Sequence, residues 1–404
     1  MSGTVDSERL ARAGWSALVE PGDQVAGTLV RLLGARHALA WVRAAAHGSL
    51  DWGALQRAAE GDLTPSDRER LGRAVLRWAG RLDSLRPERD MASAERVGGF
   101  LVVPGDEWWP AGVDDLADAA PAALWVRGEL PAASGVALVG SRASTTYGER
   151  VAYDLALGLV SRGARVVSGG AYGIDAAAHR GALGGGGPTM VVLAGGVDRA
   201  YPAGNARLFE EAVGSGGALL SEVPPGALPT KSRFLQRNRL IAALAGATVV
   251  VEAAWRSGAL STAHHAAGLL RPVGAVPGPV TSAASAGCHR LLREGHAVCV
   301  TDADEVVELL PGGIACGPRE GGAGRDGSGG DGVGALGGVA LQVHDALRVR
   351  TAVPESEIAA RAGTTVADAR AALGLLQLEG LAVRGPDGWR AGRPGRRTDT
   401  RPTG

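Results

Sequence analysis

The first 85 residues carry apolar side chains at intervals of three and four positions. The stretch 28–46, TLVRLLGARHALAWVRAAA, shows this spacing most clearly, and Gly34, Gly48 and Gly53 interrupt it. Such spacing gathers apolar residues on one face of a helix, so it predicts a series of short amphipathic helices. We expect residues 1–88 to form a small helical domain, SAM-like or helix-hairpin-helix-like, whose tryptophans fill its core. A helix-hairpin-helix contact with DNA is the alternative interpretation.

Between residues 89 and 311 the pattern changes to continuous apolar runs separated by helical stretches. The runs are GVALV, RVV, TMVV, GALL, TVVV, VGAV and AVCV. A strand that is apolar at every position is buried on both faces, which is typical of parallel sheets covered by helices on two sides. The sequence therefore predicts an α/β domain with a Rossmann-like, doubly wound, mostly parallel sheet. Ligands of such sheets bind at the carboxyl ends of the strands.

Three further segments follow the predicted sheet. Residues 312–337 are so rich in glycine that they predict a linker. Residues 338–392 hold three helical segments, a turn at Gly363 and a strand–PDG–strand hairpin, which predict a winged helix. Its recognition segment 366–380, VADARAALGLLQLEG, lacks an arginine cluster, so we interpret the module as a protein-interaction module; a sequence-specific DNA reader is the alternative. Residues 393–404 form an arginine- and proline-rich tail.

Composition limits the partners and the compartment. Basic and acidic residues each number 42, so the formal net charge is zero and any basic surface must be local. Cys288, Cys299 and Cys316 lack the spacing of a disulfide framework or a zinc site, which favours a reducing compartment. The N-terminus does not resemble a signal peptide, and no run approaches the ~18 apolar residues of a membrane span. We expect a soluble, cytoplasmic protein.

The loops at two predicted strand ends suit a phosphate. Gly140-Ser141-Arg142 follows the first run, and Thr146 and Glu149 fit a capping box that begins a helix near Tyr147. Small residues before a helix N-terminus present backbone N–H groups to an anion, and an arginine adds a bidentate donor. The next run ends in Ser168-Gly169-Gly170, where the backbone can approach a ligand closely.

Asp175 and His179 lie one turn apart on the helix that follows these glycines. We interpret them as a structural hydrogen-bonded pair, the alternative being a catalytic pair. The loop does not read G-x-G-x-x-G, and no acidic residue is placed for a nicotinamide ribose, so a dinucleotide is not expected. Neither a cofactor nor a metal is predicted.

The stretch 231–240, KSRFLQRNRL, holds the only lysine of the chain beside three arginines. It begins a predicted helix at the same edge of the sheet as the two loops, and a further helix begins near Ser261 and Thr262. With Arg142, its cations define a basic groove for a phosphodiester backbone: Lys231, Arg233, Arg237 and Arg239. Phe234 is placed to stack a base, although a single phenylalanine also suits a core.

The ordered set of motifs resembles the DprA/Smf family of DNA-processing proteins. In chain order the motifs are GSR, SGGAYGIDAAAHRGAL, VLAGGVDRAYPAGN, LLSEVPPG, FLQRNRLIAAL, VVVEA, SGALSTA and AVPG. The resemblance is close over roughly 95–310, and the segment before it and the winged helix after it also look like family parts.

The resemblance implies a protein that is not an enzyme, that binds single-stranded DNA, protects incoming DNA in transformation and helps to load the RecA recombinase. It also implies a homodimer formed through the Rossmann-like domain. Carried over by position, the nucleic-acid contacts are Ser141, Arg142, Gly169, Gly170, Lys231, Arg233, Phe234, Arg237, Arg239 and Thr262, and the residues that shape the site are Asn238 and Asp175. The chain departs from the family pattern at Leu235, His289 and His296.

A nucleotide-hydrolysing enzyme on a related fold is the alternative function. Glu222 and Glu252 each end a predicted strand, where a general acid or base would lie. Because no convergent acid pair or metal cluster accompanies them, we interpret both as carboxylates that organise loops. A transcription regulator is a third interpretation, and it depends on the winged helix alone.

Overall fold

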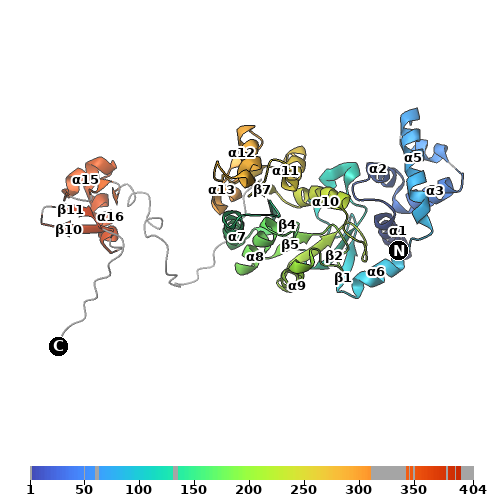
Figure 1. Ribbon diagram of the computed structural model, residues 1–404, viewed down its shortest axis with the longest axis horizontal. Helices are drawn as coiled ribbons and strands as arrows, with labels where there is room; N and C mark the ends of the chain where they lie inside the picture. Colours follow the sequence, from blue (N-terminus) through green and yellow to red (C-terminus); the bar gives the residue numbers. More distant parts are fainter. Residues whose placement is uncertain are drawn as a thin grey trace. The chain divides into compact units, whose positions relative to one another are not determined.

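The computed structural model describes residues 2–49, 51–59, 63–130, 135–310, 343–344, 346–348, 351–378, 381–386 and 388–392. The chain separates into two compact units, Met1–Pro318 and Arg319–Gly404, and each is described here by itself (Figure 1). The predicted linker 312–337 and tail 393–404 lie outside the described residues. In the part of the chain that is described, every helix is too short or too polar to cross a bilayer.

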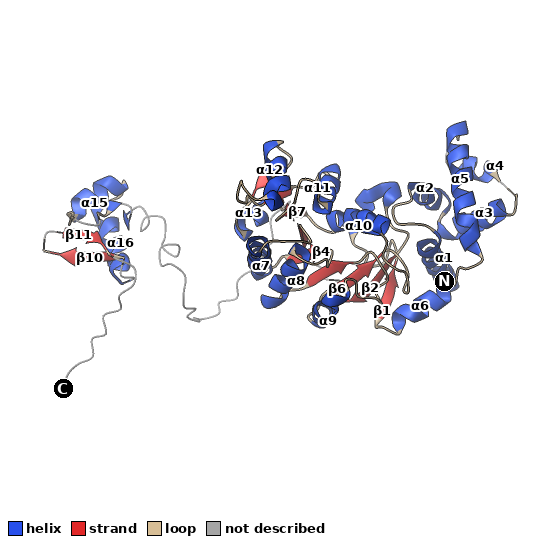
Figure 2. Cartoon of the chain, viewed as in Figure 1, coloured by secondary structure: helices blue, strands red, loops and turns tan. Residues whose placement is uncertain are grey.

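The larger unit is built on one sheet, which has nine strands within the described residues (Figure 2). The strands are β1 (Gly99–Val102), β2 (Leu124–Gly128), β3 (Gly135–Val139), β4 (Arg165–Ser168), β5 (Thr189–Val192), β6 (Ala218–Ser221), β7 (Ala247–Val250), β8 (Val273–Ala275) and β9 (Val298–Cys299). Their order is β1-β2-β6-β5-β4-β3-β7-β8-β9. The seven strands from β3 to β9 are parallel and correspond to the seven predicted runs, so the prediction of a mostly parallel sheet is confirmed. At one edge β1 and β2 add an antiparallel pair.

Helices cover both faces of this sheet because its strands are apolar on both sides. They are α7 (Thr146–Ser161), α8 (Ile174–Gly184), α9 (Ala206–Gly214), α10 (Lys231–Ala243), α11 (Gly258–Gly268), α12 (Ala286–Arg293) and α13 (Ala303–Glu308), with short 3-10 turns at Ala111–Ala119, Ala203–Asn205 and Ala283–Ser285. Ala137 and Val139 of β3 pack with α10, α11 and α12, whereas Val136 and Leu138 pack with α7, α8 and α13. This alternation is the period of two that a strand imposes.

The strand order reverses at β3. From β3 the chain proceeds outward through β4, β5 and β6, and then returns to place β7 against the other side of β3. In an open parallel sheet a crevice forms above the carboxyl ends of the two neighbouring strands whose connections lead to opposite sides of the sheet. Here that crevice lies above β3 and β7.

Among the described residues, six helices precede the sheet: α1 (Ser2–Leu18), α2 (Gln24–Leu33), α3 (Ala35–Ala46), α4 (Trp52–Ala58), α5 (Pro65–Leu82) and α6 (Pro87–Glu95). Helices α1 to α5 share a hydrophobic cluster in which Trp15 and Trp78 meet edge to face, with ring centroids 5.6 Å apart, whereas Ala94 of α6 packs with the sheet. The helices also contact the sheet, because Trp125 of β2 donates its indole N–H to the Ser16 hydroxyl at 3.1 Å. The six helices and the sheet therefore belong to one compact unit.

The smaller unit holds two helices and a hairpin among its described residues. These are α15 (Glu355–Ala362), α16 (Val366–Leu378), β10 (Ala382–Gly385) and β11 (Gly388–Ala391). Gly363 ends α15 in the left-handed conformation, at φ +64°, as the predicted turn requires. Trp389 of the hairpin is buried against Ile358 and Leu373 of the two helices.

Candidate nucleic-acid interface

A cavity of about 330 Å³ lies in the crevice above β3 and β7. It is bounded by the loop after β3, by the first turns of α10 and by the loop that leads into α11. The predicted site residues that line it are Ser141, Arg142, Asp175, Phe234, Arg237, Asn238 and Thr262. Segments separated by more than a hundred residues thus meet at one edge of the sheet.

A second cavity, of about 550 Å³, lies at the opposite edge, near the amino ends of β4, β5 and β7. Trp108, Trp109 and Leu130 contribute to its wall. Although this cavity is larger, we assign the candidate site to the crevice, because ligands of doubly wound sheets bind at the carboxyl ends of the strands. The crevice also holds the clustered arginines.

The loop that carries Arg142 is held in place by Glu252. The Glu252 carboxylate is buried and accepts hydrogen bonds from the backbone N–H of Thr145 at 2.9 Å and from its hydroxyl at 2.5 Å. Thr145 in turn caps α7 by accepting from the Gly148 N–H. The predicted capping box of Thr146 and Glu149 was therefore wrong: the N-cap is Thr145, and Glu149 accepts from the Ser144 hydroxyl at 2.8 Å. Glu252 does not line the cavity, and its contacts fit a carboxylate that organises the loop.

Two guanidinium groups lie near the ring of Phe234. Arg142 stands over its ring at 4.7 Å from the centroid, and Arg237 lies at 5.9 Å. The ring of Tyr201 approaches Phe234 to 5.6 Å. Arg142 is exposed, and within the described residues no carboxylate lies at ion-pair distance from it. An aromatic ring with cations beside it suits a stacked base and its phosphates.

Arg237 forms the floor of the cavity. It is 5% exposed, donates Nη1 to the Val192 carbonyl at 2.8 Å, and leaves its Nε without a partner in the structure. Burial lowers the pKa of Arg237 to about 10, and the nearby Asp175 opposes that shift, so the side chain stays charged at neutral pH. A Cβ on Gly169 would overlap the Arg237 guanidinium. Gly169 is thus required for packing, whereas its predicted DNA contact stays a prediction.

Gly170 has a structural reason of its own. It adopts φ +67°, a Cβ there would collide with Phe209 and Val191, and its carbonyl accepts from the Asn205 side chain at 2.9 Å. It lies behind the wall of the cavity, and Ala171 is the lining residue of this loop.

Asp175 and His179 do not pair with each other. Asp175 accepts from the Ala171 N–H at 3.3 Å, and the buried His179 places Nδ1 at 2.7 Å from the Thr189 hydroxyl. Burial lowers the pKa of His179 to about 3, so the ring is neutral. Burial raises the pKa of Asp175, although the charge of Arg237 acts in the opposite direction. The predicted hydrogen bond between Asp175 and His179 was therefore wrong, because each residue bonds to another partner. The two residues also lack the geometry of a catalytic pair.

The raised pKa of Asp175 predicts a pH dependence of anion binding. As pH falls through this raised pKa, Asp175 loses its charge while Arg237 keeps its own, so the affinity for oligo-dT is expected to rise. Asp175→Asn removes the titrating carboxyl, so its affinity for oligo-dT should stay at the low-pH level of the wild type throughout the series. The measurement is fluorescence anisotropy of labelled oligo-dT over a pH series. A variant whose binding varies with pH as steeply as the wild type would contradict the assignment.

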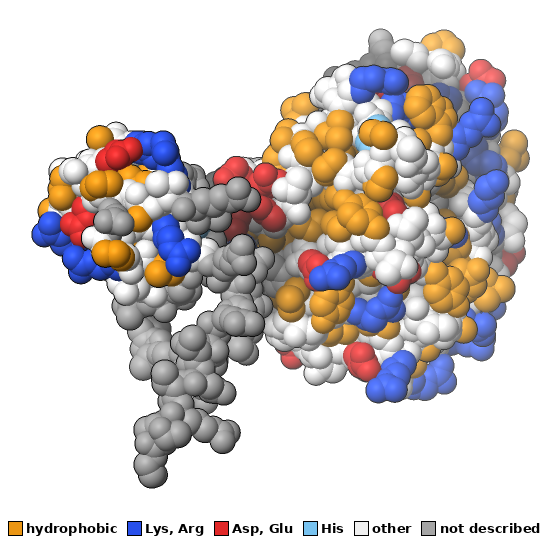
Figure 3. Space-filling model, turned by 60° about the vertical axis from the view of Figure 1, so that its left-hand side comes forward, with side chains coloured by type: hydrophobic (Ala, Val, Ile, Leu, Met, Phe, Trp, Pro, Cys, Tyr) orange, Lys and Arg blue, Asp and Glu red, His pale blue; other side chains and the backbone are white. Residues whose placement is uncertain are grey.

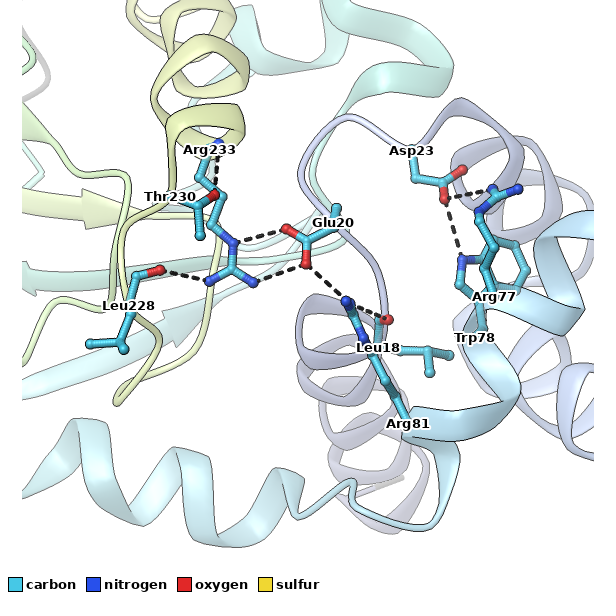
Figure 4. Close-up of polar contacts among 9 residues, drawn as sticks. All are labelled: Leu18, Glu20, Asp23, Arg77, Trp78, Arg81, Leu228, Thr230 and Arg233. Carbon is cyan, nitrogen blue, oxygen red and sulfur yellow. Dashed lines mark hydrogen bonds and ion pairs between the residues drawn. The ribbon is translucent and has the colours of Figure 1, made fainter.

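Three of the predicted cations lie outside the cavity wall. Lys231 is exposed at the first residue of α10. Arg233 donates Nε and Nη2 to the two carboxylate oxygens of Glu20, at 2.9 and 3.1 Å, and Nη1 to the Leu228 carbonyl at 3.0 Å (Figure 4). The hydrogen bonds from Arg233 hold the pKa of Glu20 below its ordinary value, against its partial burial.

Arg239 is the third of these cations. It is 3% exposed and donates Nη2 to both oxygens of Glu222, at 2.7 and 2.8 Å. Glu222 also accepts from the Gly22 N–H at 3.4 Å, so this buried pair anchors the segment between α1 and α2. Its partners fit the interpretation of Glu222 as an organising carboxylate and leave the DNA contact of Arg239 as a prediction.

Several neighbours of the cavity were not anticipated from the sequence. The exposed Arg256 lines it from the loop before α11, and Tyr201 contacts Phe234. Asn238 donates to the Gly258 carbonyl at 3.2 Å and so ties α10 to the start of α11.

Two of the three residues that depart from the family pattern are placed as follows. Leu235 lines the cavity, and His289 places Nε2 at 3.0 Å from the Gly278 carbonyl.

His296, the third departure, lies away from this crevice. Its Nδ1 is 3.6 Å from a carboxylate oxygen of Glu294.

Basic side chains do not form one continuous surface on the face of the larger unit that is shown in Figure 3. They form several separate groups there among apolar and neutral side chains. No group of three or more histidine, cysteine and acidic side chains arranged for a metal occurs within the described residues. Fold and site together define a Rossmann-like protein whose carboxyl-edge cavity joins arginines to an aromatic ring.

The chain belongs to the DNA recombination-mediator protein A family, whose model matches residues 100–311. It is 44% identical over 357 residues to a protein of Mycobacterium tuberculosis described as a DNA processing protein DprA, covering 83% of this chain and 89% of that one. It is 39% identical to the Smf protein of Escherichia coli, over 59% of this chain and 65% of that one. The X-ray structure of DNA processing protein A from Streptococcus pneumoniae superposes with a TM-score of 0.57 at 28% identity, covering 76% of this chain and 98% of that one.

Proposed function

We propose that this protein binds single-stranded DNA in the cavity above β3 and β7. The observation that carries the proposal is that Arg142 and Arg237 both lie within 6 Å of the Phe234 ring in one cavity. The guanidinium of Arg142 is a bidentate donor for a phosphodiester, and a base can stack on an aromatic ring regardless of sequence. Arg256 and the N-terminus of α11 add positive potential at the same wall.

A single strand fits this cavity better than a duplex. The volume of about 330 Å³ admits a nucleotide with its base exposed, not a paired and stacked helix. Stacking on a protein ring requires an unstacked base, which single strands offer without a cost of unpairing. Contact through backbone charge and ring faces has little preference for sequence.

The wider role of the proposal rests on the family. Because the family is one of recombination mediators, the bound strand is passed to the RecA recombinase, in transformation or in other homologous recombination. The protein does this in the cytoplasm as a homodimer formed through its Rossmann-like domain. Glu222 and Glu252 both have structural partners, which gives nucleotide hydrolysis no support from this site.

The smaller unit is a winged helix that serves protein contacts in this proposal. Its two helices and hairpin have the order of such a module, and Arg370 of α16 is paired with Glu355 at 2.9 Å. A recognition helix for DNA needs arginines directed at phosphates, and α16 offers one that already has a carboxylate partner.

A salt series tests the proposed function. Gel-shift or anisotropy titration of oligo-dT should show tight binding at low salt and a linear loss of log affinity with log salt, because each phosphate contact releases counterions. About three contacts would give a slope near −2 for a single strand. Affinity that is independent of salt, or preference for duplex of equal length, would exclude the proposal.

A further inference from the structure

The helix α5 carries a stripe of arginines along one exposed face. The α5 stripe consists of Arg70, Arg73, Arg77 and Arg81, spaced by three and four residues. At about 1.5 Å per residue it is roughly 16 Å long. The adjacent side of the helix packs into the N-terminal core through residues such as Leu71, Val75 and Trp78. The stripe thus faces solvent on a helix whose other side fixes its position.

The stripe keeps a positive balance although carboxylates lie beside it. Helix α5 contains five arginines against Asp67 and Glu69, and Asp23 and Glu20 of the neighbouring segment pair with Arg77 and Arg81, which leaves a net charge of 5 − 4 = +1. Arg73 pairs with Glu69 at 3.6 Å and Arg77 with Asp23 at 3.5 Å, and their side chains remain 63% and 58% exposed. The Arg73–Glu69 pair is long and exposed on both sides, so it contributes little to stability and a phosphate can exchange for the carboxylate. Asp23 is only 15% exposed, but the guanidinium of Arg77 stays accessible to a phosphate.

Glu20 connects the stripe to α10. Its carboxylate is shared, with Arg233 of α10 at 2.9 Å on one side and Arg81 of α5 at 3.1 Å on the other (Figure 4). Arg81 uses one nitrogen, Nη1, for both Glu20 and the Leu18 carbonyl at 3.3 Å. Within the described part of the chain its Nη2 is therefore left for a further anion. Arg233 directly precedes Phe234, which lines the cavity.

The position of this connection is fixed by close packing. Gly22 adopts φ +77°, and a Cβ there would collide with the side chains of Gln236 and Arg239 on α10. Its N–H reaches Glu222, the partner of Arg239. The segment that carries Glu20 is thus seated on α10, and the cavity and the stripe keep one arrangement.

We propose that a single strand held in the cavity continues past Arg233 and along the α5 stripe, which contacts its phosphates. The inference rests on the proposed function and extends it to a second, nonspecific segment of the DNA path. Arginines about one helical turn apart, at i and i+4, offer successive donors along an extended backbone. One end of the bound single-stranded DNA lies in the cavity, and the α5 stripe extends the DNA-binding site beyond it.

Oligonucleotide length separates the two parts of the path. For oligo-dT of about three nucleotides, with one in the cavity and its neighbours at the cavity mouth, Arg73→Gln/Arg77→Gln should bind like the wild type. For about thirty nucleotides its affinity should fall roughly 10- to 30-fold near 0.1 M salt, and the slope of log affinity against log salt should become shallower by about 1.4, or 0.7 for each lost contact. Arg73→Lys/Arg77→Lys retains the charge and should retain the affinity.

The matched control is Arg89→Gln/Arg207→Gln, which removes two exposed arginines from α6 and α9, on the other face of the sheet from α10. It should leave binding at both lengths unchanged. Equal affinity of wild type and Arg73→Gln/Arg77→Gln for the long oligonucleotide would overturn the stripe while leaving the cavity intact. Binding of neither length by the wild type would overturn the proposed function itself. Thermal melting of each variant checks that the fold is retained.

Discussion

Arg142→Glu is expected to weaken oligo-dT binding by roughly 10- to 100-fold near 0.1 M salt. Arg142 is exposed, stands over Phe234 and has no carboxylate partner within the described residues, so its guanidinium is available to a phosphate. A hydrogen bond to a charged group contributes about 1.5–3 kcal/mol, and the glutamate adds repulsion of the phosphate. The measurement is anisotropy of labelled oligo-dT at several salt concentrations.

Arg207→Glu is the matched control for this variant. Arg207 is also an exposed arginine near the start of a helix, with 92% of its side chain accessible, but it lies on α9 and is paired with Glu211. The same change of charge there should alter binding by less than about threefold, since it acts only through a screened field. Arg142→Lys should be intermediate because lysine keeps the charge and loses the bidentate fork. If Arg142→Glu and Arg207→Glu bind equally well, the cavity is not the DNA site.

The parallel sheet could be predicted because its strands are uniformly apolar. GVALV and TVVV correspond to β3 and β7, and the positions of the intervening helices follow from the lengths between such runs. The antiparallel edge was not predicted. Its strands β1 and β2 lie on either side of the tryptophan-rich segment 103–123, where no repeating pattern of strand and helix marks them. Antiparallel pairing at an edge depends on that connection, which local sequence does not specify.

The site could be predicted in part. The Gly140-Ser141-Arg142 loop and Phe234 meet, as parallel strand ends require. The four cations of 231–240 diverge, however, because a helix turns each residue by about 100° from the last. Arg237 lies in the cavity, while Arg233 and Arg239 are directed to Glu20 and Glu222. Glu20 precedes Arg233 by 213 residues, and no spacing in the sequence indicates such a pair.

Glu222→Ala is expected to lower stability more than any exposed charge change, by about 3–5 kcal/mol. Arg239 is buried, Glu222 accepts both of its Nη2 hydrogen bonds, and the Nε and Nη1 atoms of Arg239 have no partner in the structure. Removal of the carboxylate therefore leaves an uncompensated cation inside the protein, and also frees the Gly22 segment that Glu222 holds. The measurement is the midpoint of thermal and urea unfolding.

Glu211→Ala is the control, because it breaks the exposed pair with Arg207 and should cost less than about 1 kcal/mol. Glu222→Ala/Arg239→Met should recover part of the loss, since it removes the stranded charge together with its partner. The same variant decides between the two interpretations of Glu222. A Glu222→Ala protein with wild-type stability that has lost a nucleotide-hydrolysing activity of the wild type would make Glu222 a catalytic acid or base. A destabilised protein that still binds oligo-dT at low temperature assigns Glu222 to the buried anchor between the N-terminal helices and α10.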